Sequence, residues 1–250
     1  MTKATDLEVR IYEDRKSMGT AAAEKFAKEA AALLKMKEEI NVVFAAAPSQ
    51  NEFLAALHYE NLDWSRINAF HMDEYIGLAA DAPQGFGNFL KHRLFDKFNF
   101  KSVNYLNGNA TNIADECERY TALLNQYPVD VVCMGIGENG HLAFNDPPVA
   151  DFEDKHTVKV VELDEICRQQ QVNDGCFAQI NQVPTQALTL TIPALLSATY
   201  INCVVPGLTK ANAVANTLNS EITTENPATI LRKHPRAVLF LDQDSSKLIR

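Results

Sequence analysis

Two hydrophobic patterns alternate along the chain. Short, uninterrupted apolar runs predict strands buried on both faces, because helices that cover both sides of a sheet leave its strands no polar side. Apolar residues spaced three and four apart predict helices with one buried face. In the first half of the chain these patterns predict helices over Thr20–Glu39, Glu52–His58, Phe86–Phe98 and Ile113–Gln126, and strands over Ile40–Ala46, Ile67–Phe70, Val103–Leu106 and Val129–Met134.

The second half of the chain continues the alternation after a polar gap. It predicts strands over Ala187–Thr191, Tyr200–Val205 and Ala237–Leu241, and helices over Pro193–Ala198, Lys210–Leu218 and Pro227–Lys233. Strands and helices at this spacing are typical of βαβ units. The predicted fold class is therefore α/β, with a single domain over residues 1–250 and an open, mostly parallel, Rossmann-like sheet with helices on both faces. The gap itself, Val149–Pro184, is polar and poorly periodic, so we expect a lid or an excursion from the sheet there.

Composition and charge narrow the classes of function. The 250 residues are 46% hydrophobic and carry a net charge of −9, without a basic cluster. No nucleic-acid or membrane partner is therefore expected, although a few cations in one pocket still suit an anionic small molecule. Five cysteines and no C-x-x-C pair argue against a disulfide framework and a structural zinc site. The polar start, Met1–Arg15, is unlike a secretory signal, and no apolar run approaches a membrane span, so we expect a cytoplasmic protein.

Three polar loops follow predicted strands, where ligands bind in open parallel sheets. They are Ala47–Asn51, His71–Tyr75 and Gly135–Pro148. Acidic residues and histidines gather in the second and third loops. Three such loops at one edge of the sheet predict an active site.

The third loop contains the densest set of candidate residues. Its glycines, Gly135, Gly137 and Gly140, let backbone N–H groups approach a ligand and match G-x-G-x-x-G. A dinucleotide site is disfavoured, because a histidine rather than a helix follows the last glycine. His141 and Asp146 suggest an imidazole oriented by a carboxylate; the alternative is a loop histidine with a backbone partner.

Asp73 and Glu74 are adjacent, so in an extended segment at most one of them faces a pocket. A buried aspartate at a strand end is a candidate general base, whereas a solvated acidic loop is the usual meaning of such a pair. A metal site built from Asp73, His71, His141 and Asp146 lacks the spacing of known metal motifs, and none is expected.

These loops resemble the glucosamine-6-phosphate deaminases (isomerases). His71–Leu78 is similar to their [NH]-[ML]-D-E-Y-x-G-L segment, and Gly135–Pro147 to their G-x-G-x-[DN]-G-H-x-[AG]-F-N-E-P segment. Further similar segments, in the right order over nearly the whole chain, are Val183–Thr189, Gly207–Ala211 and Pro227–Pro235. The related 6-phosphogluconolactonases resemble this chain less, since they tend to have D-E-R at Asp73–Tyr75 and lack the F-N-E/D-P continuation.

The resemblance implies a role for each matching residue. Asp73 would move a proton between C1 and C2 of the open-chain sugar. His141 would help to open the pyranose ring, oriented by Asp146 and Asn139. This suits the residue types, because an isomerisation needs a carboxylate base and ring opening needs a group that titrates near neutral pH.

The resemblance also implies a phosphate-binding end to the pocket. Lys210 matches the family's phosphate-binding lysine at a helix start, where N–H groups favour anions. Arg168 corresponds to its phosphate-binding arginine, in a register that its spacing to Val183 leaves open. Gly137 and Gly140 would contact the substrate through their backbone.

Two departures from the family pattern bear on the substrate. The first phosphate loop resembles A-T-G-[GS]-T-P in the family, but Ala46–Asn51 here has no Gly or Thr, and Pro48 has no N–H to donate. We expect Ser49 to bind the anion there together with Lys210 and, if its register holds, Arg168; the alternative is that Ser49 only caps a helix beginning at Glu52. Asp146 stands in place of a Glu, which shortens its reach.

The resulting hypothesis is an enzyme that converts glucosamine 6-phosphate, or a close analogue, to fructose 6-phosphate and ammonium without a cofactor. This is the chemistry of amino-sugar and N-acetylglucosamine catabolism. The alternatives are a hydrolase of the 6-phosphogluconolactonase type and a non-catalytic sensor that binds a sugar phosphate. The sequence leaves the sugar and the presence of a homo-oligomer open.

Overall fold

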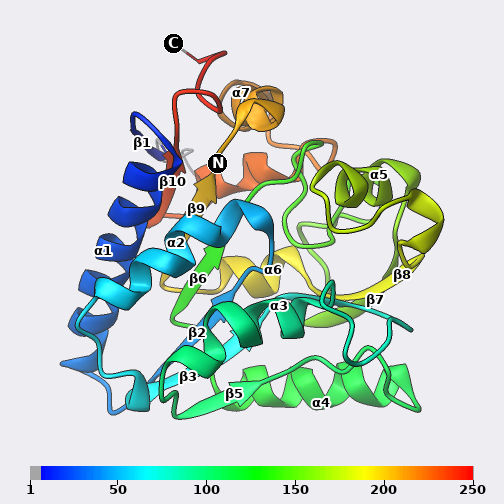
Figure 1. Cartoon of the computed structure of the whole chain (residues 1–250), viewed down its shortest axis with the longest axis horizontal. Coiled ribbons are helices and arrows are strands. Elements are labelled where there is room, and N and C mark those ends of the chain that lie inside the picture. Colours follow the sequence, from blue (N-terminus) through cyan, green and yellow to red (C-terminus); the bar gives the residue numbers. More distant parts are fainter. Residues whose placement is uncertain (1–6, 250) are drawn as a thin grey trace.

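Seven strands form one parallel sheet in the order β1–β10–β9–β6–β2–β3–β5 (Figure 1). The computed structural model describes residues 7–249, so residues 1–6 and 250, at the two ends of the predicted domain, lie outside the described part. The strands are β1 (Glu8–Ile11), β2 (Ile40–Phe44), β3 (Ile67–His71), β5 (Ser102–Asn104), β6 (Val131–Met134), β9 (Tyr200–Val205) and β10 (Ala237–Leu241). The predicted open, mostly parallel sheet is confirmed.

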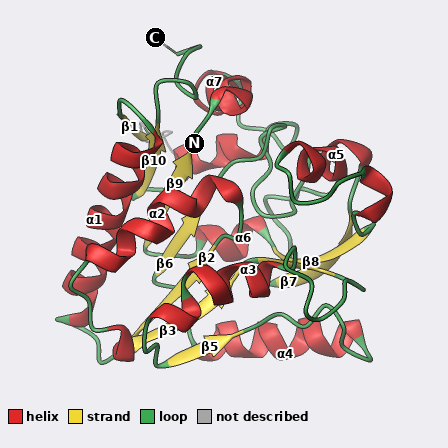
Figure 2. Ribbon diagram, viewed as in Figure 1, coloured by secondary structure: helices red, strands yellow, loops and turns green. Residues whose placement is uncertain are grey.

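A smaller, antiparallel sheet stands beside the main one. Its strands, in the order β4–β8–β7, are β4 (Asp73–Tyr75), β7 (Val158–Glu162) and β8 (Gln186–Leu190). Only Met72 separates β3 from β4, so the small sheet begins where a main strand ends. The α-helices (Figure 2) are α1 (Arg15–Leu34), α2 (Asn51–Ala56), α3 (Phe86–Arg93), α4 (Ile113–Gln126), α5 (Glu165–Asn173), α6 (Ile192–Leu196) and α7 (Ala211–Asn219). The 3-10 helices are η1 (Pro48–Gln50), η2 (Leu57–Tyr59), η3 (Trp64–Arg66), η4 (Phe95–Lys97), η5 (Ile180–Gln182), η6 (Leu208–Lys210) and η7 (Pro227–Lys233).

Each face of the main sheet packs against a hydrophobic core of its own, because successive strand residues point to opposite faces. Phe44 of β2 belongs to the core beneath α1, α2 and α3, where its ring meets Phe26 edge-on. Val43, one residue earlier, belongs to the core beneath α4, α6 and α7, together with Phe70 and Tyr120. The prediction of helices on both faces is confirmed.

The chain reverses direction across the sheet next to β2. From β2 it builds outward through β3 to β5, and it then returns to place β6 on the other side of β2. In open α/β sheets such a reversal leaves a crevice at the carboxyl ends of the two strands involved. The loops after β2 and β6 both begin at this crevice.

Some predicted elements differ in extent or kind. α1 begins at Arg15 rather than Thr20, because Asp14 caps it: the N–H of Ser17 donates to Asp14 Oδ1 over 2.7 Å. The α-helix predicted over Phe86–Phe98 ends at Arg93, and Pro227–Lys233 is a 3-10 helix. The strand predicted over Ala187–Thr191 exists as β8, but it lies in the small sheet.

The patterns did not predict β1, β4, β7 or α5. β4 consists of Asp-Glu-Tyr, and β7 and α5 lie within the polar gap Val149–Pro184. Pairing of β7 with β8 makes this segment an excursion from the main sheet; its role as a lid stays a prediction. None of the helices within residues 7–249 combines the length and the apolarity that a membrane crossing requires.

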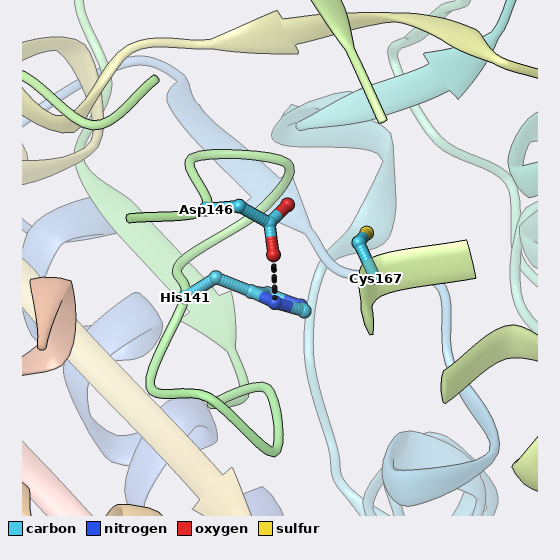
Figure 3. A group of neighbouring side chains, drawn as sticks. All are labelled: His141, Asp146 and Cys167. Carbon is cyan, nitrogen blue, oxygen red and sulfur yellow. Dashed lines mark ion pairs between the residues drawn. The ribbon is translucent and has the colours of Figure 1, made fainter. Parts of the chain in front are cut away.

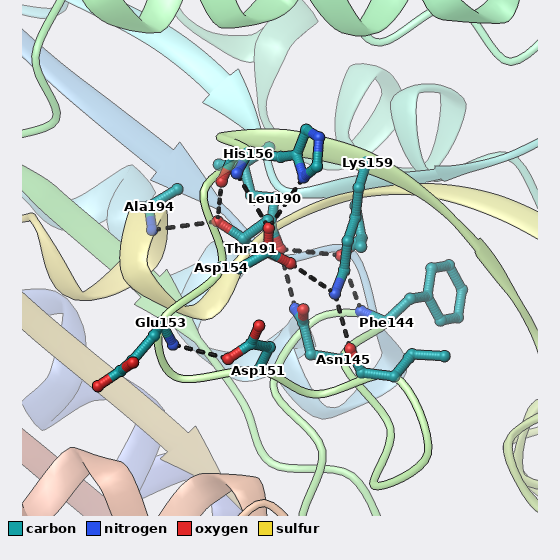
Figure 4. A network of polar contacts seen from close by, with 12 residues as sticks. Phe144, Asn145, Asp151, Glu153, Asp154, His156, Lys159, Leu190, Thr191 and Ala194 are labelled. Carbon is teal, nitrogen blue, oxygen red and sulfur yellow. Dashed lines mark hydrogen bonds and ion pairs between the residues drawn. The ribbon is translucent and has the colours of Figure 1, made fainter.

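Buried polar contacts anchor the chain after β6 to the small sheet (Figure 4). The side-chain amide of Asn145 donates to the carbonyl oxygens of Leu142 and Leu190, each over 2.8 Å. Lys159 of β7 forms an ion pair of 2.9 Å with Asp154. The loop that begins at the crevice is therefore held against β7 and β8.

Candidate active site

A cleft lies at the crevice beside β2 and β6. It encloses about 570 Å³, counting the space at its open mouth. The residues predicted from the sequence that line it are Ser49, Asp73, Gly137, His141 and Lys210. Asp73 and His141, which are far apart in the sequence, thus share one cleft.

Asp73 is a buried carboxyl without a hydrogen-bonding partner. Its backbone pairs with Thr189 of β8, which turns the side chain into the cleft. Within the described chain, no group donates a hydrogen bond to its carboxylate. Burial, reinforced by the charge of Glu74, raises the pKa of Asp73 well above its ordinary value. A carboxylate in this state is a stronger base than one in water.

Glu74 has a different task from its neighbour. Its carboxylate accepts N–H groups from Tyr75, Phe86 and Gly87 over 2.9, 3.0 and 2.8 Å. The last two belong to the first turn of α3, so Glu74 caps that helix. The expectation that only one of the two adjacent acids faces the pocket is confirmed.

His71 belongs to the core and not to a metal site. Its Nε2 accepts the N–H of Leu106 over 2.9 Å, so Nδ1 carries the proton and donates to the carbonyl of Asp73 over 2.9 Å. Burial lowers the pKa of His71 to about 4. The neutral ring fixes the turn from β3 into β4.

His141 is oriented by two oxygen acceptors. Its Nδ1 lies 2.8 Å from Asn139 Oδ1 and 2.9 Å from Asp146 Oδ1. We assign the ring proton to Nδ1 from these contacts, which leaves Nε2 as an acceptor. Asn139 in turn donates to Asp146 over 2.8 Å. The three residues form one connected group, as the family resemblance implied.

Glycine is required beneath the imidazole. A Cβ on Gly137 would lie 2.2 Å from Cε1 of His141, so a side chain there would displace the ring. Gly140 has a φ of +86°, in the region that favours glycine. Of these two, only Gly137 lines the cleft.

Asp146 reaches His141 despite its short side chain. Burial by itself raises the pKa of Asp146, but the charge and hydrogen bond of His141 and the hydrogen bond of Asn139 together bring this pKa below its ordinary value. Asp146 therefore stays ionised beside the ring.

Ser49 and Lys210 form the opposite, cationic part of the cleft. Burial lowers the pKa of Lys210, against the charges of Asp174 and Glu138. Ser49 lies in η1, and neither η1 nor α2 is capped by a side chain, so the alternative that Ser49 serves as an N-cap is wrong. Gln50 donates to Ser49 Oγ over 3.1 Å, which leaves the Ser49 hydroxyl proton for another acceptor.

The structure does not bring Arg168 into the cleft. Its guanidinium donates to the carbonyl oxygens of Ile180 over 2.7 Å and Val183 over 3.0 Å. Arg168 lies on α5, and these contacts tie that helix to the chain before β8. In this arrangement its charge is not available to a ligand in the cleft.

The opposite side of α5 reaches the cleft instead. Gln170, Gln171 and Asp174 line it, and none of them was predicted. The Oε1 atom of Gln170 accepts the N–H of Glu138 over 2.8 Å, which joins α5 to the loop after β6. No motif marks these residues, since the polar gap shows no helical period.

The described residues include one group with the donor types of a metal site. His141, Asp146 and Cys167 place one ligand atom each within 4.8 Å of one another (Figure 3). The four residues considered from the sequence do not form such a group. Both ring nitrogens of His71 are already used, which excludes it.

Comparisons with known proteins agree with this geometry. A family model for glucosamine-6-phosphate isomerases/6-phosphogluconolactonase matches residues 13–240. A glucosamine-6-phosphate deaminase of Bacillus cereus (strain B4264) is 34% identical over 216 residues, 86% of this chain and 80% of the relative. One of Streptococcus sanguinis (strain SK36) is 34% identical over 206 residues, 82% and 86% of the two chains.

Solved structures show the same likeness. A monomeric glucosamine-6-phosphate deaminase superposes with a TM-score of 0.86 at 29% identity, over 97% of this chain and 100% of its own. A 6-phosphogluconolactonase from Thermotoga maritima shares the fold, with a TM-score of 0.76 at 22% identity over 94% and 99% of the two chains.

Proposed function

The chain belongs to the family of glucosamine-6-phosphate isomerases and 6-phosphogluconolactonases, as its motifs suggested, and we propose that it deaminates and isomerises glucosamine 6-phosphate or a close analogue. One observation carries the proposal. The unpaired, buried carboxyl of Asp73 lies in the same cleft as the oriented imidazole of His141. A base and a separate acid–base group are what this reaction requires.

The reaction begins with ring opening. Nε2 of His141 takes the proton from the C1 hydroxyl and passes it to the ring oxygen as the C1–O5 bond breaks. Asp146 and Asn139 hold the imidazole through Nδ1 and stabilise its charged form. The product of this step is an open-chain amino aldehyde.

Isomerisation and loss of nitrogen follow at C1 and C2. Asp73 removes the proton from C2 while O1 gains a proton, and return of a proton to C1 leaves an imine at C2. Addition of water to the imine releases ammonium and fructose 6-phosphate. The raised pKa of Asp73 favours its role as the base, because its carboxylate gains more by taking up a proton.

The phosphate would lie at the cationic part of the cleft. Lys210 supplies the positive charge, and Ser49 supplies a hydroxyl donor that Gln50 leaves free. A buried cation and a directed donor replace the Gly-Thr loop that this chain lacks. The N–H groups of Gly137 and Gly140 are not available to the sugar, because they donate to the carbonyl oxygens of His141 and Gly137 over 3.0 Å each.

Location and assembly are further parts of the proposal. We expect the protein in the cytoplasm, because all five cysteines are free thiols, as in a reducing compartment. The similar deaminase described as monomeric favours a single chain over a homo-oligomer. The mass of the purified protein in solution tests this point.

The direct test is ammonium release from phosphorylated and free amino sugars. Glucosamine 6-phosphate should be the preferred substrate, and Asp73→Asn should lower kcat by about 1000-fold with binding nearly unchanged. Asp81→Asn, at an exposed position, is the matched control.

Three results would contradict the proposal. Near-normal turnover by Asp73→Asn would place the base elsewhere. Hydrolysis of 6-phosphogluconolactone without ammonium release would favour the lactonase alternative. Binding of the sugar phosphate without either reaction would identify a sensor.

A further inference from the structure

A thiol is buried beside His141, next to the cleft. Cys167, in the first turn of α5, is buried beside His141 and Asp146, which are buried as well (Figure 3). Its sulfur, an imidazole nitrogen and a carboxylate oxygen all lie within 4.8 Å of one another. We propose that these three residues form an inhibitory binding site for Zn²⁺.

The donor set matches the chemistry of zinc. Thiolate sulfur, imidazole nitrogen and carboxylate oxygen are its usual ligands in proteins, and the sulfur selects against Mg²⁺ and Ca²⁺. Three protein ligands leave one position of a tetrahedral site for water. Sequence spacing does not reveal this group, because Cys167 comes from the polar gap rather than from the histidine loop.

A second observation points to a ligand at this place. The Oδ2 atom of Asp146 is buried, and no N–H or hydroxyl group among the described residues donates to it; the Cys167 thiol, a weak donor, is the group beside this carboxylate. Asp146 as a whole is 2% exposed. A buried carboxylate oxygen with at most a weak thiol donor costs free energy, and a bound cation would satisfy it.

Small movements suffice to form the site. Zinc bonds of about 2.0–2.3 Å in a tetrahedral arrangement place neighbouring ligand atoms roughly 3.3–3.7 Å apart. His141 Nδ1 and Asp146 Oδ1, now 2.9 Å apart, would separate slightly, and the sulfur would approach by about 1 Å. The thiol proton leaves to solvent as the sulfur–zinc bond forms.

Zinc bound to one nitrogen of the His141 ring would inhibit the reaction, because the neutral ring has a single proton for its two nitrogens. Zinc on Nδ1 displaces the proton there, and the neutral ring then carries its proton on Nε2. Nε2 ceases to be an acceptor on the cleft side, so ring opening stops. This consequence rests on the proposed function, whereas binding of the metal does not.

The test compares two cysteine variants in metal-free protein. Zn²⁺ should inhibit ammonium release, and Cys167→Ser, measured against its own metal-free rate, should need at least about tenfold more Zn²⁺. Cys176→Ser removes a half-buried thiol outside the group and should leave the inhibition unchanged. With Co²⁺ as the probe, the protein and Cys176→Ser should show a thiolate-to-cobalt absorption band that Cys167→Ser lacks.

The two readouts separate this inference from the proposed function. A cobalt band that depends on Cys167 supports the site even if no ammonium is released. Ammonium release that Zn²⁺ does not inhibit, or inhibits equally in Cys167→Ser, overturns the site and leaves the function intact. Absence of the cobalt band in the unmodified protein overturns the site as well.

Discussion

Two buried aspartates beside the cleft, Asp73 and Asp146, have environments that suit different functions. Asp146 is paired with His141 and Asn139, and its pKa lies below the ordinary value despite burial. Asp73 has no partner for its carboxylate, and burial raises its pKa. Environments that move two carboxyl pKa values apart separate a charge-stabilising group from a base. The difference arises from the charge of His141 and the hydrogen bonds to Asp146, not from depth.

The unpaired state of Asp73 should cost stability. Its pKa in the folded protein is above the unfolded value, so the carboxyl's contribution to stability is fully present below the unfolded pKa, near 3.8, and is lost as pH rises through the folded pKa. Asparagine avoids this cost. Asp73→Asn should therefore increase the free energy of unfolding, by about 1–3 kcal/mol at neutral pH and by less in acid.

Urea unfolding of both proteins at several pH values measures this effect, with Asp81→Asn as the control at an exposed position. An advantage of Asp73→Asn that stays constant from acid to neutral pH would contradict the ionisation argument. A loss of stability at neutral pH would show that the carboxylate has a partner in solution.

At the scale of elements, α1 supports the loop that carries Ser49. Arg15, at the start of α1, donates two hydrogen bonds of 2.9 Å to the carboxylate of Glu52 and one of 3.1 Å to the carbonyl of Pro48. Pro48 cannot contribute an N–H to a phosphate cradle. The position of Ser49 thus depends on a helix that does not line the cleft.

Arg15→Met should loosen this loop while leaving the catalytic groups in place. We expect KM for the phosphorylated sugar to rise about two- to fivefold with kcat nearly unchanged, because a half-exposed ion pair contributes at most about 1 kcal/mol. Arg10→Met, which breaks the exposed pair with Glu8, is the control. An equal loss of kcat in Arg15→Met would mean that the loop also positions Asp73 or His141.

Features that depend on neighbouring residues could be predicted from the sequence, whereas features held by contacts between distant segments could not. The groups after β3 and β6 were found because each motif is local, and Asp73 needs only the pleat of a strand to face the cleft. α5 was missed because contacts with distant segments hold it, such as that between Gln170 and the N–H of Glu138. The position of Arg168 outside the cleft could not be predicted either, since its partners are backbone carbonyl groups that no sequence pattern reveals.

At the scale of the whole molecule, two sheets meet at the site. The reversal of the main sheet beside β2 places the loops after β2 and β6 together. β4 then leaves β3 to pair with β8, which carries Asp73 out of the main sheet and into the cleft. Alternating patterns predict the first feature, but the second depends on a pairing between strands that lie far apart in the chain.

His71 holds the junction of these sheets, and its protonation should weaken the whole fold. The pKa of His71 falls from an unfolded value of 6.5 to about 4, so its contribution to stability is fully present above pH 6.5 and is lost as pH falls toward 4. The loss should be about 1.4 kcal/mol per pH unit. His71→Gln cannot take up this proton.

The free energy of unfolding should therefore fall with acid less steeply in His71→Gln than in the unmodified protein. Taking the difference between the two proteins removes the opposite contribution of Asp73, whose raised pKa favours the folded state in acid. His156→Gln, at an exposed ring, should keep the full slope. Equal slopes between pH 6.5 and 4 in His71→Gln and the unmodified protein would show that the junction opens and hydrates before the core unfolds.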